Sequence, residues 1–399
     1  MAFEMKKLND VCRLTNGRAY KKPEMLSEGK YPLLRVGNFF SNRAWYYSDL
    51  ELNEDKYCDN GDLLYAWSAS FGPRIWDGGK VIYHYHIWKI KINEELVDKG
   101  YLFHLLDWDT EQIKAEQGTG STMIHVTKGS MENRYLPFPP IPEQKRIVAI
   151  LDQAFADIEQ ARAKTEQNLK NARELFESYL QQVFSQRSEG WVETTLGNLS
   201  DINYGYTEKA SFEANGPHFL RITDIQNNDV NWGKVPHCPI SKADYAKHKL
   251  ETGDIVFART GATTGKSYLL SNPPEAVAAS YLIRLRVKSD ALLPEFVKFF
   301  FQTKGYWDVV NAGMTGSAQG GFNASKLAAM EITYPDCRDT QRVFVDKLSL
   351  VAQEIEQIIS KYEKKLVVLD ELKKSILQKA FSGELSKTLE VDTNKGAVA

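Results

Sequence analysis

The chain has 399 residues, 43% of them hydrophobic and 26% charged, which is typical of an ordinary globular protein with about two to four domains. It holds no run of about 18 apolar residues, and its first residues lack the apolar core of a secretion signal, so we expect a cytoplasmic protein without a membrane span. The formal net charge of −2 argues against a chain that binds nucleic acid entirely by itself, because such proteins are usually basic. Positive charge is local, within 65–91 and 254–288, so a partner would have to supply the rest of a DNA-binding surface.

Two stretches of the sequence, near 3–184 and near 191–381, follow the same plan. The second begins with WVETTLGNL where the first begins with FEMKKLNDV. The further matches are GDLLYA from Gly61 with GDIVFA from Gly253, TGS from Thr119 with TGS from Thr315, Lys145-Arg146-Ile147 with Gln341-Arg342-Val343, and LQQVFS from Leu180 with LQKAFS from Leu377. A repeat of this length predicts two similar globular units, which suit an asymmetric two-part target better than one active site.

Residues 1–140 are predicted to form short strands joined by turns, with one helix near 94–116. The run VIYHYHIWKIKI from Val81 is β-branched and aromatic, which favours a strand that would place His84 and His86 on one face. The segment PFPPIP, which ends at Pro142, stops any regular element, because proline lacks the amide donor and restricts its preceding neighbour. The first domain boundary is predicted there.

From Glu143 onward, apolar and small residues recur at alternating steps of four and three, which predicts a heptad-patterned helix of about 40 residues and roughly 60 Å. The residues of this seam are Ile147, Leu151, Ala154, Ile158, Ala161, Thr165, Asn168, Ala172, Leu175 and Tyr179. The second half repeats the layout, with strands at IVFA from Ile255 and YLIRLRV from Tyr281, a helix near 294–311 and a boundary at Pro335. The seam of its closing helix is Phe344, Leu348, Val351, Ile355, Ile358, Tyr362, Leu369, Leu372 and Ile376.

These elements predict an α+β fold, in which two similar α/β domains in a pseudo-twofold arrangement are separated by two long helices that form an antiparallel coiled coil. Two separate helical hairpins, or coils between chains, are the alternative arrangement. The expected division is 1–141 for the first domain, 142–187 for the first long helix, 188–335 for the second domain, 336–383 for the second long helix, and 384–399 for a mobile tail.

Several short motifs come close to known catalytic or binding patterns. The segment ARTGATTGKS from Ala258 resembles a phosphate-binding loop, but that motif needs glycine where Thr260 stands. We expect either a tight loop whose amides, with Arg259 and Lys266, could face an anion, or an ordinary turn between strands. The segment NPPE is similar to the N-P-P-aromatic motif of amino-methyltransferases, but Glu275 cannot stack on a base, so a turn is predicted.

No complete catalytic or metal-binding set stands out. His84 and His86 lack a third ligand, so a packed pair is the better interpretation. Glu143-Gln144-Lys145 has the E-x-K spacing of many nucleases but lies at a helix start rather than on a strand. Cys12, Cys58, Cys238 and Cys337 show no C-x-x-C spacing, which predicts reduced structural thiols. The sequence therefore predicts no catalytic residue, no metal and no cofactor in this chain.

The order of these features resembles a known family. Tandem units carry a T-G-S loop, then a junction such as Pro140-Ile141-Pro142 followed by Glu143-Gln144-Lys145-Arg146-Ile147, then a long helix that closes in L-Q-x-x-F-S. From about residue 3 to about residue 383, this pattern is similar to the specificity subunit of a type I restriction-modification enzyme. The second junction departs from it, because PDCRDTQR from Pro335 lacks the proline pair and the Glu-Gln, so docking there is less well defined.

The resemblance implies two target recognition domains, each of which reads one half of a bipartite, asymmetric site in double-stranded DNA. It implies that the helices act as a spacer and as a docking surface for two methyltransferase subunits, and that motor-nuclease (restriction) subunits join the assembly. S-adenosylmethionine, ATP and Mg would then be bound by those partners, with no catalysis in this chain.

Polar and basic loop residues are the expected contacts to base edges and phosphates. The candidates are Ser68, Ser70, Arg74, Lys80, Thr119, Ser121 and Lys128 in the first unit, and Arg259, Thr260, Thr264, Lys266, Ser267, Thr315, Ser317 and Lys326 in the second. Two other classes remain open: an autonomous nuclease or methyltransferase with degenerate motifs, and a coiled-coil adaptor that binds only proteins.

Overall fold

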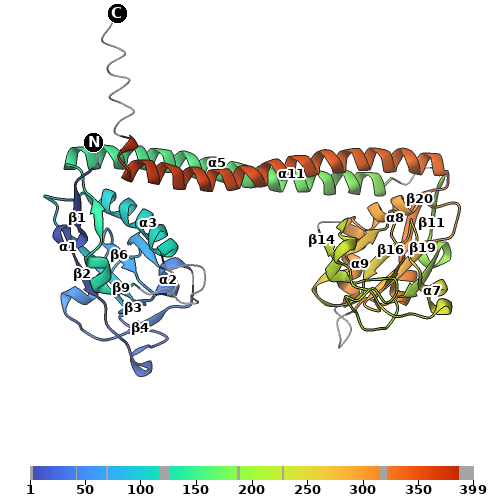
Figure 1. The fold of residues 1–399 in the computed structure, drawn as a ribbon, viewed down its shortest axis with the longest axis horizontal. Coiled ribbons are helices and arrows are strands. Elements are labelled where there is room, and N and C mark those ends of the chain that lie inside the picture. The colour runs from blue at the N-terminus through green and yellow to red at the C-terminus, as the bar shows by residue number, and fades with distance from the viewer. Residues whose placement is uncertain are drawn as a thin grey trace, which may run out of the picture. The chain divides into compact units, whose positions relative to one another are not determined.

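The computed structural model describes residues 3–41, 43–68, 71–116, 126–186, 189–226, 229–314 and 321–385. The residues that pack together form two compact units, unit 1 (Met1–Thr165 with Lys364–Ala399) and unit 2 (Glu166–Glu363), and both long helices contribute to each (Figure 1). The boundary between the two units falls within each long helix, whereas the sequence predicts that each long helix is a segment of its own. The five-part division by residue number, with its tail from 384, therefore stays a proposal.

Unit 1 contains an antiparallel four-stranded sheet, a mixed four-stranded sheet and a two-stranded ribbon. The first sheet has the order β2 (Cys12–Asn16), β9 (Ile87–Ile92), β6 (Leu63–Ala66), β7 (Gly72–Ile75). The second has the order β4 (Tyr46–Ser48), β3 (Tyr31–Leu34), β8 (Val81–Tyr83), β5 (Tyr57–Cys58), with β3 and β8 parallel. The ribbon pairs β1 (Met5–Lys7) with β10 (Tyr135–Pro137). The helices are α1 (Leu8–Val11), η1 (Lys22–Glu24), α2 (Val36–Phe40), η2 (Glu54–Lys56), α3 (Lys99–Glu116) and α4 (Lys128–Glu132).

Unit 2 repeats the antiparallel sheet, the ribbon and the parallel strand pair, while its described residues show no four-stranded mixed sheet. Its antiparallel sheet has the order β12 (Ser200–Tyr204), β19 (Leu282–Val287), β16 (Ile255–Ala258), β17 (Ser267–Leu269). The remaining strand pairs are β11 (Trp191–Thr195) with β20 (Glu331–Pro335), β13 (His218–Leu220) with β18 (Ala276–Ala278) in parallel, and β14 (Ile225–Gln226) with β15 (Asp229–Val230). The helices are α6 (Leu196–Leu199), η3 (Ile222–Asp224), η4 (Trp232–Lys234), α7 (Lys242–His248), η5 (Gly261–Thr263), α8 (Pro294–Phe300), α9 (Lys304–Met314) and α10 (Ala324–Ala328).

Two predicted elements differ from the structure. The run from Val81 is not one strand, because β8 ends at Tyr83 and β9 begins at Ile87. His84 forms an isolated bridge with Arg18 and His86 lies in the turn that follows, so the two do not share one strand face. The helix expected near 294–311 is two helices, and the hydroxyl of Thr303 accepts a hydrogen bond from the Tyr306 amide at the start of the second.

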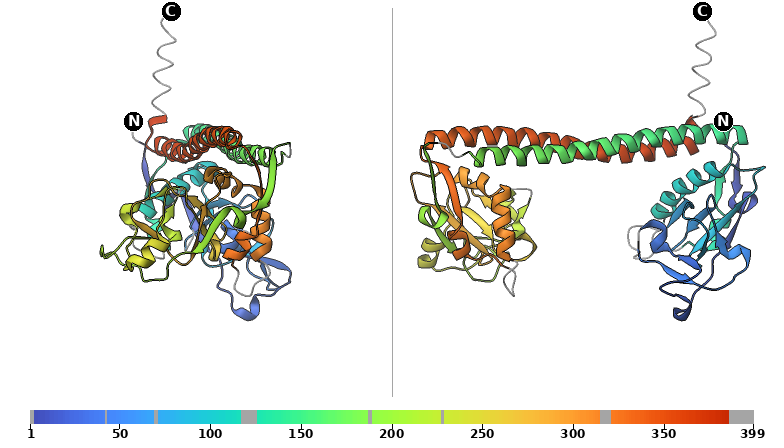
Figure 2. Two further views of the ribbon diagram at one scale, coloured as in Figure 1. Left: turned by 90° about the vertical axis from the view of Figure 1, so that its right-hand side faces the viewer. Right: turned by 180° about the vertical axis from the view of Figure 1, so that it is seen from behind.

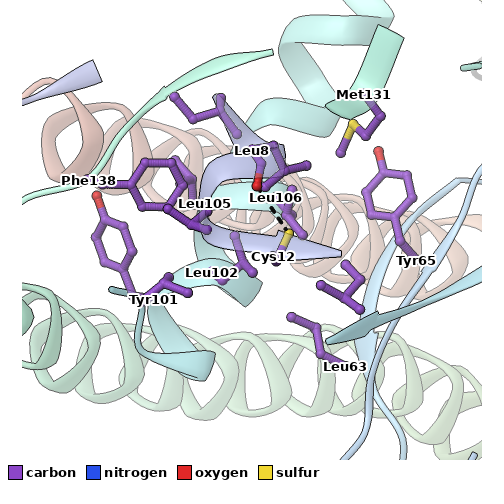
Figure 3. Close-up of a cluster of buried hydrophobic side chains, with 14 of the residues drawn as sticks. Leu8, Cys12, Leu63, Tyr65, Tyr101, Leu102, Leu105, Leu106, Met131 and Phe138 are labelled. Carbon is purple, nitrogen blue, oxygen red and sulfur yellow. Dashed lines mark hydrogen bonds between the residues drawn. The ribbon is translucent and has the colours of Figure 1, made fainter. Parts of the chain in front are cut away.

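The core of unit 1 lies between its antiparallel sheet and the apolar face of α3 (Figure 3). Leu102 and Leu105 of α3 are fully buried against strand residues such as Leu63. The Cys12 thiol donates to the Leu8 carbonyl at 3.5 Å, and burial followed by the charge of Glu132 raises its pKa to about 12. This thiol therefore stays protonated and acts as a small core residue.

The long helices α5 (Ile141–Phe184) and α11 (Arg338–Phe381) run antiparallel where they meet within each unit (Figures 1 and 2). In unit 1, Ile147 of α5 shares a core with Leu377 of α11, while Arg162 pairs with Asp370. In unit 2, the cores and ion pairs likewise join late α5 to early α11, as in Leu180 with Leu348 and Arg173 with Glu363 (3.4 Å). The predicted antiparallel pairing is confirmed.

Most of the predicted seam is at least half-buried, but three members are wrong. Leu175 is 60% exposed, Ile358 39% and Leu372 43%. Phe176 packs into the core of unit 2 next to Leu175, so the seam shifts by one residue there.

A buried glutamine fixes the start of α5. Gln144 is fully buried, its side-chain oxygen accepts from the Asp98 amide (2.8 Å), and its side-chain nitrogen donates to the carbonyls of Leu96 (3.0 Å) and Pro139 (2.7 Å). These bonds pair backbone groups that precede α3 and α5 and that follow β10. Such groups would be costly to bury without a hydrogen-bond partner. Gln144 is thus structural and not part of a nuclease E-x-K motif.

Gln341 does the same at the start of α11. It accepts from the Leu293 amide (2.9 Å) and donates to the carbonyls of Ala291 (2.6 Å) and Pro335 (2.7 Å). The expected match of Gln341 with Lys145 is therefore off by one residue, because Gln341 occupies the position of Gln144. The two junctions share their local structure although their sequences differ.

Candidate nucleic-acid interface

The central strand of each unit leads into a loop that is held by the same backbone hydrogen bonds. In unit 1, the Trp67 amide donates to the His86 carbonyl (3.0 Å) and the Trp67 carbonyl accepts from the Val126 amide (3.4 Å). In unit 2, Arg259 makes the equivalent bonds with Tyr281 (3.2 Å) and Phe322 (2.9 Å). We call these two places the loop edge of each unit.

A glycine closes the loop edge on one side in both units. The Gly17 amide donates to the Ile87 carbonyl (3.2 Å), and the Gly205 amide donates to the Leu282 carbonyl (2.9 Å). A Cβ atom at Gly17 would collide with the Tyr83 carbonyl, and one at Gly205 would collide with the carbonyl oxygens of the β18–β19 turn. Only glycine fits, so the two turns are held at the same place in both units.

The loop edge of unit 1 is aromatic. The Trp67 ring lies 5.8 Å from that of Trp88 in a stacked arrangement and 4.9 Å from the His86 ring. Its indole nitrogen donates to the Tyr85 carbonyl (2.9 Å), and the Tyr85 side chain is 37% exposed. This surface offers ring faces and edges rather than charge.

The histidines beside this surface pack against each other. The His84 and His86 rings lie 4.8 Å apart, and burial, His86 and Arg35 together lower the pKa of His84 to about 4. His84 is therefore neutral near pH 7. Within the described ranges, no group of three or more His, Cys, Asp or Glu side chains could hold a metal ion.

The basic candidates of unit 1 are engaged with protein groups. Arg74 on β7 donates to the Phe39 carbonyl (2.6 Å) and to Asp77 (2.8 Å). Lys80 is exposed, with its ammonium 4.7 Å from the Tyr57 ring centroid. Arg74 would have to exchange these bonds to bind a ligand, whereas Lys80 could move at little cost.

The other candidates of unit 1 are spread out. Ser68 is buried, and Lys128 is exposed at the start of α4, 3.5 Å from Glu132. Ser70, Thr119 and Ser121 lie outside the described residues. The structure therefore places Ser68 next to the loop edge but gives it little accessible surface.

The loop edge of unit 2 is built around a cation. The Arg259 guanidinium lies 4.9 Å from the centroid of the Tyr204 ring, and its buried Nε has no hydrogen-bond acceptor among the residues that the structure describes. Tyr204 is 41% exposed and Tyr281 62% exposed. An arginine poised on an aromatic ring with an unused donor can turn toward an acceptor on a ligand.

The remaining candidates from the β16–β17 loop differ in accessibility. Thr260 bridges to Gly321, and Thr264 is buried with its hydroxyl donating to the Gly261 carbonyl (2.8 Å). Lys266 is exposed, and half-buried Ser267 begins strand β17. A strand instead of a long helix follows the glycines, so the helix N-terminus of a nucleotide-binding loop is absent from this place.

Lys326 approaches from α10, where its ammonium donates to the Gly313 carbonyl (2.7 Å). Thr315 and Ser317 lie outside the described residues. In unit 2 the structure thus brings Arg259 and Thr260 to one edge, with Lys266 on the same loop.

Sequence reasoning missed the exposed tyrosines Tyr85, Tyr204 and Tyr281, which flank the loop edges. It also missed a difference behind them: Arg221 of unit 2 pairs with Asp224 (2.7 Å), whereas the guanidinium of Arg35, from the matching LRV segment, lies 4.3 Å from the Tyr46 ring centroid. These tyrosines could have been found from the sequence as aromatic residues that interrupt the apolar alternation of a strand next to a turn.

Comparison with known proteins places the chain in a family. The model of the type I restriction modification DNA specificity domain matches residues 2–168 and again 188–364. Among curated relatives, the EcoBI specificity subunit of Escherichia coli is 23% identical over 95% of this chain and 85% of its own length. The MjaVIII specificity subunit of Methanocaldococcus jannaschii is 24% identical over 96% and 93%.

Solved structures share the fold. A chain from a study of complex assembly and conformational transition of the type I R-M system aligns with a TM-score of 0.78 at 21% identity, covering 95% of this chain and 97% of that one. The HsdS subunit from Thermoanaerobacter tengcongensis aligns with a TM-score of 0.55 at 21% identity, covering 96% and 97%. The double match of the family model covers most of the sequence, and the chain belongs to the family of type I restriction modification DNA specificity domains.

Proposed function

We propose that this chain is the DNA sequence-specificity subunit of a type I restriction-modification complex, in which each unit reads one half of a bipartite, asymmetric site. The observation that carries the proposal is the contrast at the loop edges. The same backbone hydrogen bonds present Trp67 in unit 1 and Arg259 in unit 2. A conserved frame with different side chains suits two readers of unlike sequences.

The two loop edges suit different base contacts. A guanidinium such as that of Arg259 can donate to the acceptors of guanine in the major groove, whereas an aromatic surface such as that of Trp67 and Tyr85 suits apolar contact with a thymine methyl group. Exposed lysines such as Lys80 and Lys266 would contact phosphates and set the register.

The long helices would dock two methyltransferase subunits. Apolar side chains remain exposed on α11, namely Val343, Leu350, Ile358, Val367, Val368 and Leu372. Exposed apolar residues on a helix that is already paired suit contact with further protein. The partners would bind S-adenosylmethionine, ATP and Mg, and motor-nuclease subunits would complete the assembly in the cytoplasm. In the part of the chain that the structure describes, no helix is both long and apolar enough to cross a membrane.

Methylome sequencing of a host that expresses this chain with its methyltransferase tests the proposal most directly. We expect methylation at one bipartite motif with a fixed gap. A motif without two separate halves would contradict it. The purified chain alone, incubated with DNA, methyl donor and magnesium, should neither modify nor cleave. Activity without partners would favour the autonomous enzyme instead.

The net charge of −2 provides a second test. The chain alone should bind DNA weakly, because it lacks the positive charge that supplies most non-specific affinity. Adding the methyltransferase should raise the affinity for DNA strongly. No gain would favour an adaptor that binds only proteins.

The helices are proposed to set the gap between half-sites. Insertion of one heptad into both α5 and α11 adds about 10 Å of helix. Since base pairs are spaced about 3.4 Å apart, the gap should widen by about three base pairs while both half-sites stay the same. An unchanged gap would exclude the helices as the ruler.

A further inference from the structure

Unit 2 has a cavity of about 410 Å³ that lies between the last turn of α5, the β11–β20 ribbon and the start of α9. Phe184, Tyr306 and Met330 form much of its apolar wall, and Gln181 and Thr303 contribute polar groups. Its volume is within the range of about 300–1,000 Å³ that is common for ligand pockets.

In unit 1 the matching place holds a tryptophan. The Trp108 ring packs 5.5 Å from that of Phe381, and its indole nitrogen donates to the Gln378 side chain (2.9 Å). Gln378 and Phe381 belong to LQKAFS and correspond to Gln181 and Phe184 of LQQVFS.

By residue count, Thr303 corresponds to Trp108; it lies in the break between α8 and α9 and lines the cavity beside Gln181. The count starts from the amides that the two junction glutamines bind. Gln144 binds the amide of Asp98, ten positions before Trp108, and Gln341 binds the amide of Leu293, ten positions before Thr303. Replacement of an indole by a threonine side chain leaves Gln181 without the donor that Gln378 binds in unit 1.

A second difference enlarges the cavity. The Leu8 amide donates to the Arg134 carbonyl (3.0 Å) and the Leu196 amide to the Met330 carbonyl (2.9 Å), so Arg134 and Met330 are equivalent. Arg134 is tied to the buried Asp109 (2.7 Å), whereas Met330 presents an apolar surface to the cavity.

We propose that this cavity receives a tryptophan-sized aromatic side chain from a methyltransferase partner, in the place that Trp108 fills in unit 1. The inference rests on the proposed function. We expect an aromatic occupant because Trp108 packs against the matching residues in unit 1. Buried aromatic residues also dominate the energetics of protein interfaces. Gln181 would accept its ring N–H, as Gln378 accepts that of Trp108.

The charge of the rim selects a protein segment over nucleic acid. Glu193 and Glu331 line the cavity, and none of the described lining residues is Lys or Arg. A carboxylate such as that of Glu331 repels phosphates and favours basic residues next to the inserted ring. In unit 1, Trp108 already occupies this place and borders a neighbouring groove of about 340 Å³ with Glu111 and Gln378. The insertion is therefore expected at unit 2 alone, so the two methyltransferase subunits should bind with unequal affinity, and the tighter one at unit 2.

Filling the cavity tests the inference. Val309 lines it and is 49% exposed, so Val309→Trp can place a ring in the cavity without disturbing the core. Asp308→Trp, on the same helix at an exposed residue that does not line the cavity, is the matched control. With the full chain and its methyltransferase, sedimentation velocity and calorimetry should show that Val309→Trp weakens the tighter site at least tenfold, while Asp308→Trp leaves both sites unchanged.

Thr303→Trp, which copies unit 1, is the second filling variant, although it removes the hydroxyl that accepts from the Tyr306 amide. If both filling variants bind methyltransferase like the wild type, the inference is overturned and the proposed function stands. If the wild-type chain binds no methyltransferase, the proposed function fails as well.

A photo-crosslink keeps the inference testable if the filling variants do not fold. Benzoyl-phenylalanine in place of Asp308, which is exposed beside the cavity without lining it, should crosslink to a methyltransferase peptide that contains an aromatic residue next to Lys or Arg. Crosslinks that reach no such peptide would overturn the inference.

Discussion

Unit 1 and unit 2 hold the residue after their central strand with the same two backbone hydrogen bonds, yet that residue is Trp67 in one unit and Arg259 in the other. The frame depends on amides, carbonyls and a glycine with no room for a side chain, so it tolerates exchange of the side chain that it carries. A similar contrast appears beside the ribbon of each unit, where unit 1 has Trp108 on α3 and Arg134 before β10, while Thr303 and Met330 line a cavity in unit 2. Recognition and docking surfaces can thus diverge on a constant scaffold.

The largest expected effect on stability comes from replacing Arg134 of unit 1 by methionine, the residue that unit 2 has at the equivalent position (Met330). Asp109 is only 1% exposed, and burial raises its pKa while Arg134 opposes that rise. Arg134→Met should destabilise the protein by about 3–5 kcal/mol at pH 7, because it leaves a buried carboxylate without its cation.

The pH dependence of this effect has a definite sign. Without Arg134 the folded-state pKa of Asp109 lies further above its unfolded value, so the loss should be larger at pH 7 than at pH 4. Urea unfolding at both values measures it. The exposed pair Arg173–Glu363 supplies the control Arg173→Met, which should cost less than about 1 kcal/mol.

The junction glutamines test what the two units share. Gln144→Leu and Gln341→Leu should each cost about 2–4 kcal/mol, because buried amides and carbonyls lose their partners. Chemical unfolding of both variants should give similar losses, with exposed Gln153→Leu as the control. A loss in only one unit would contradict the equivalence of the junctions.

Substitutions at the two loop edges should affect recognition of different half-sites. Arg259→Ala should weaken DNA binding by the assembled complex by about 1–3 kcal/mol and relax specificity in one half-site. Trp67→Ala should relax the other half-site. Binding to a library of DNA duplexes measures both, and an effect of either variant on both halves would argue against one reader per unit.

The last prediction concerns the pH dependence of stability that His84 causes. Its folded pKa of about 4 lies below the unfolded value of about 6.5, so the folded protein binds fewer protons between these values. Stability should therefore fall as pH drops from about 6.5 to about 4, and His84→Gln should flatten this slope. The same slope in wild type and variant would show that His84 does not cause it.

The sequence by itself determined the repeat, the strands at Ile255 and Leu282, the helix at Lys99 and the two long helices. The spacing of apolar residues and the glycines and prolines that end each element are local properties of the chain. The LQxxFS motif and the junction prolines were enough to indicate the family. Membership then follows from the match to the family model over both halves.

Only the tertiary structure decided which residues are equivalent and which are accessible. Gln341 matches Gln144 because both bind the same backbone groups, which a comparison of letters misplaced by one residue. Ser68 and Thr264 are polar loop residues that folding buries, whereas Tyr281 stands exposed in an apolar run. Burial and long-range hydrogen bonds depend on segments far apart in the chain, and no local pattern encodes them.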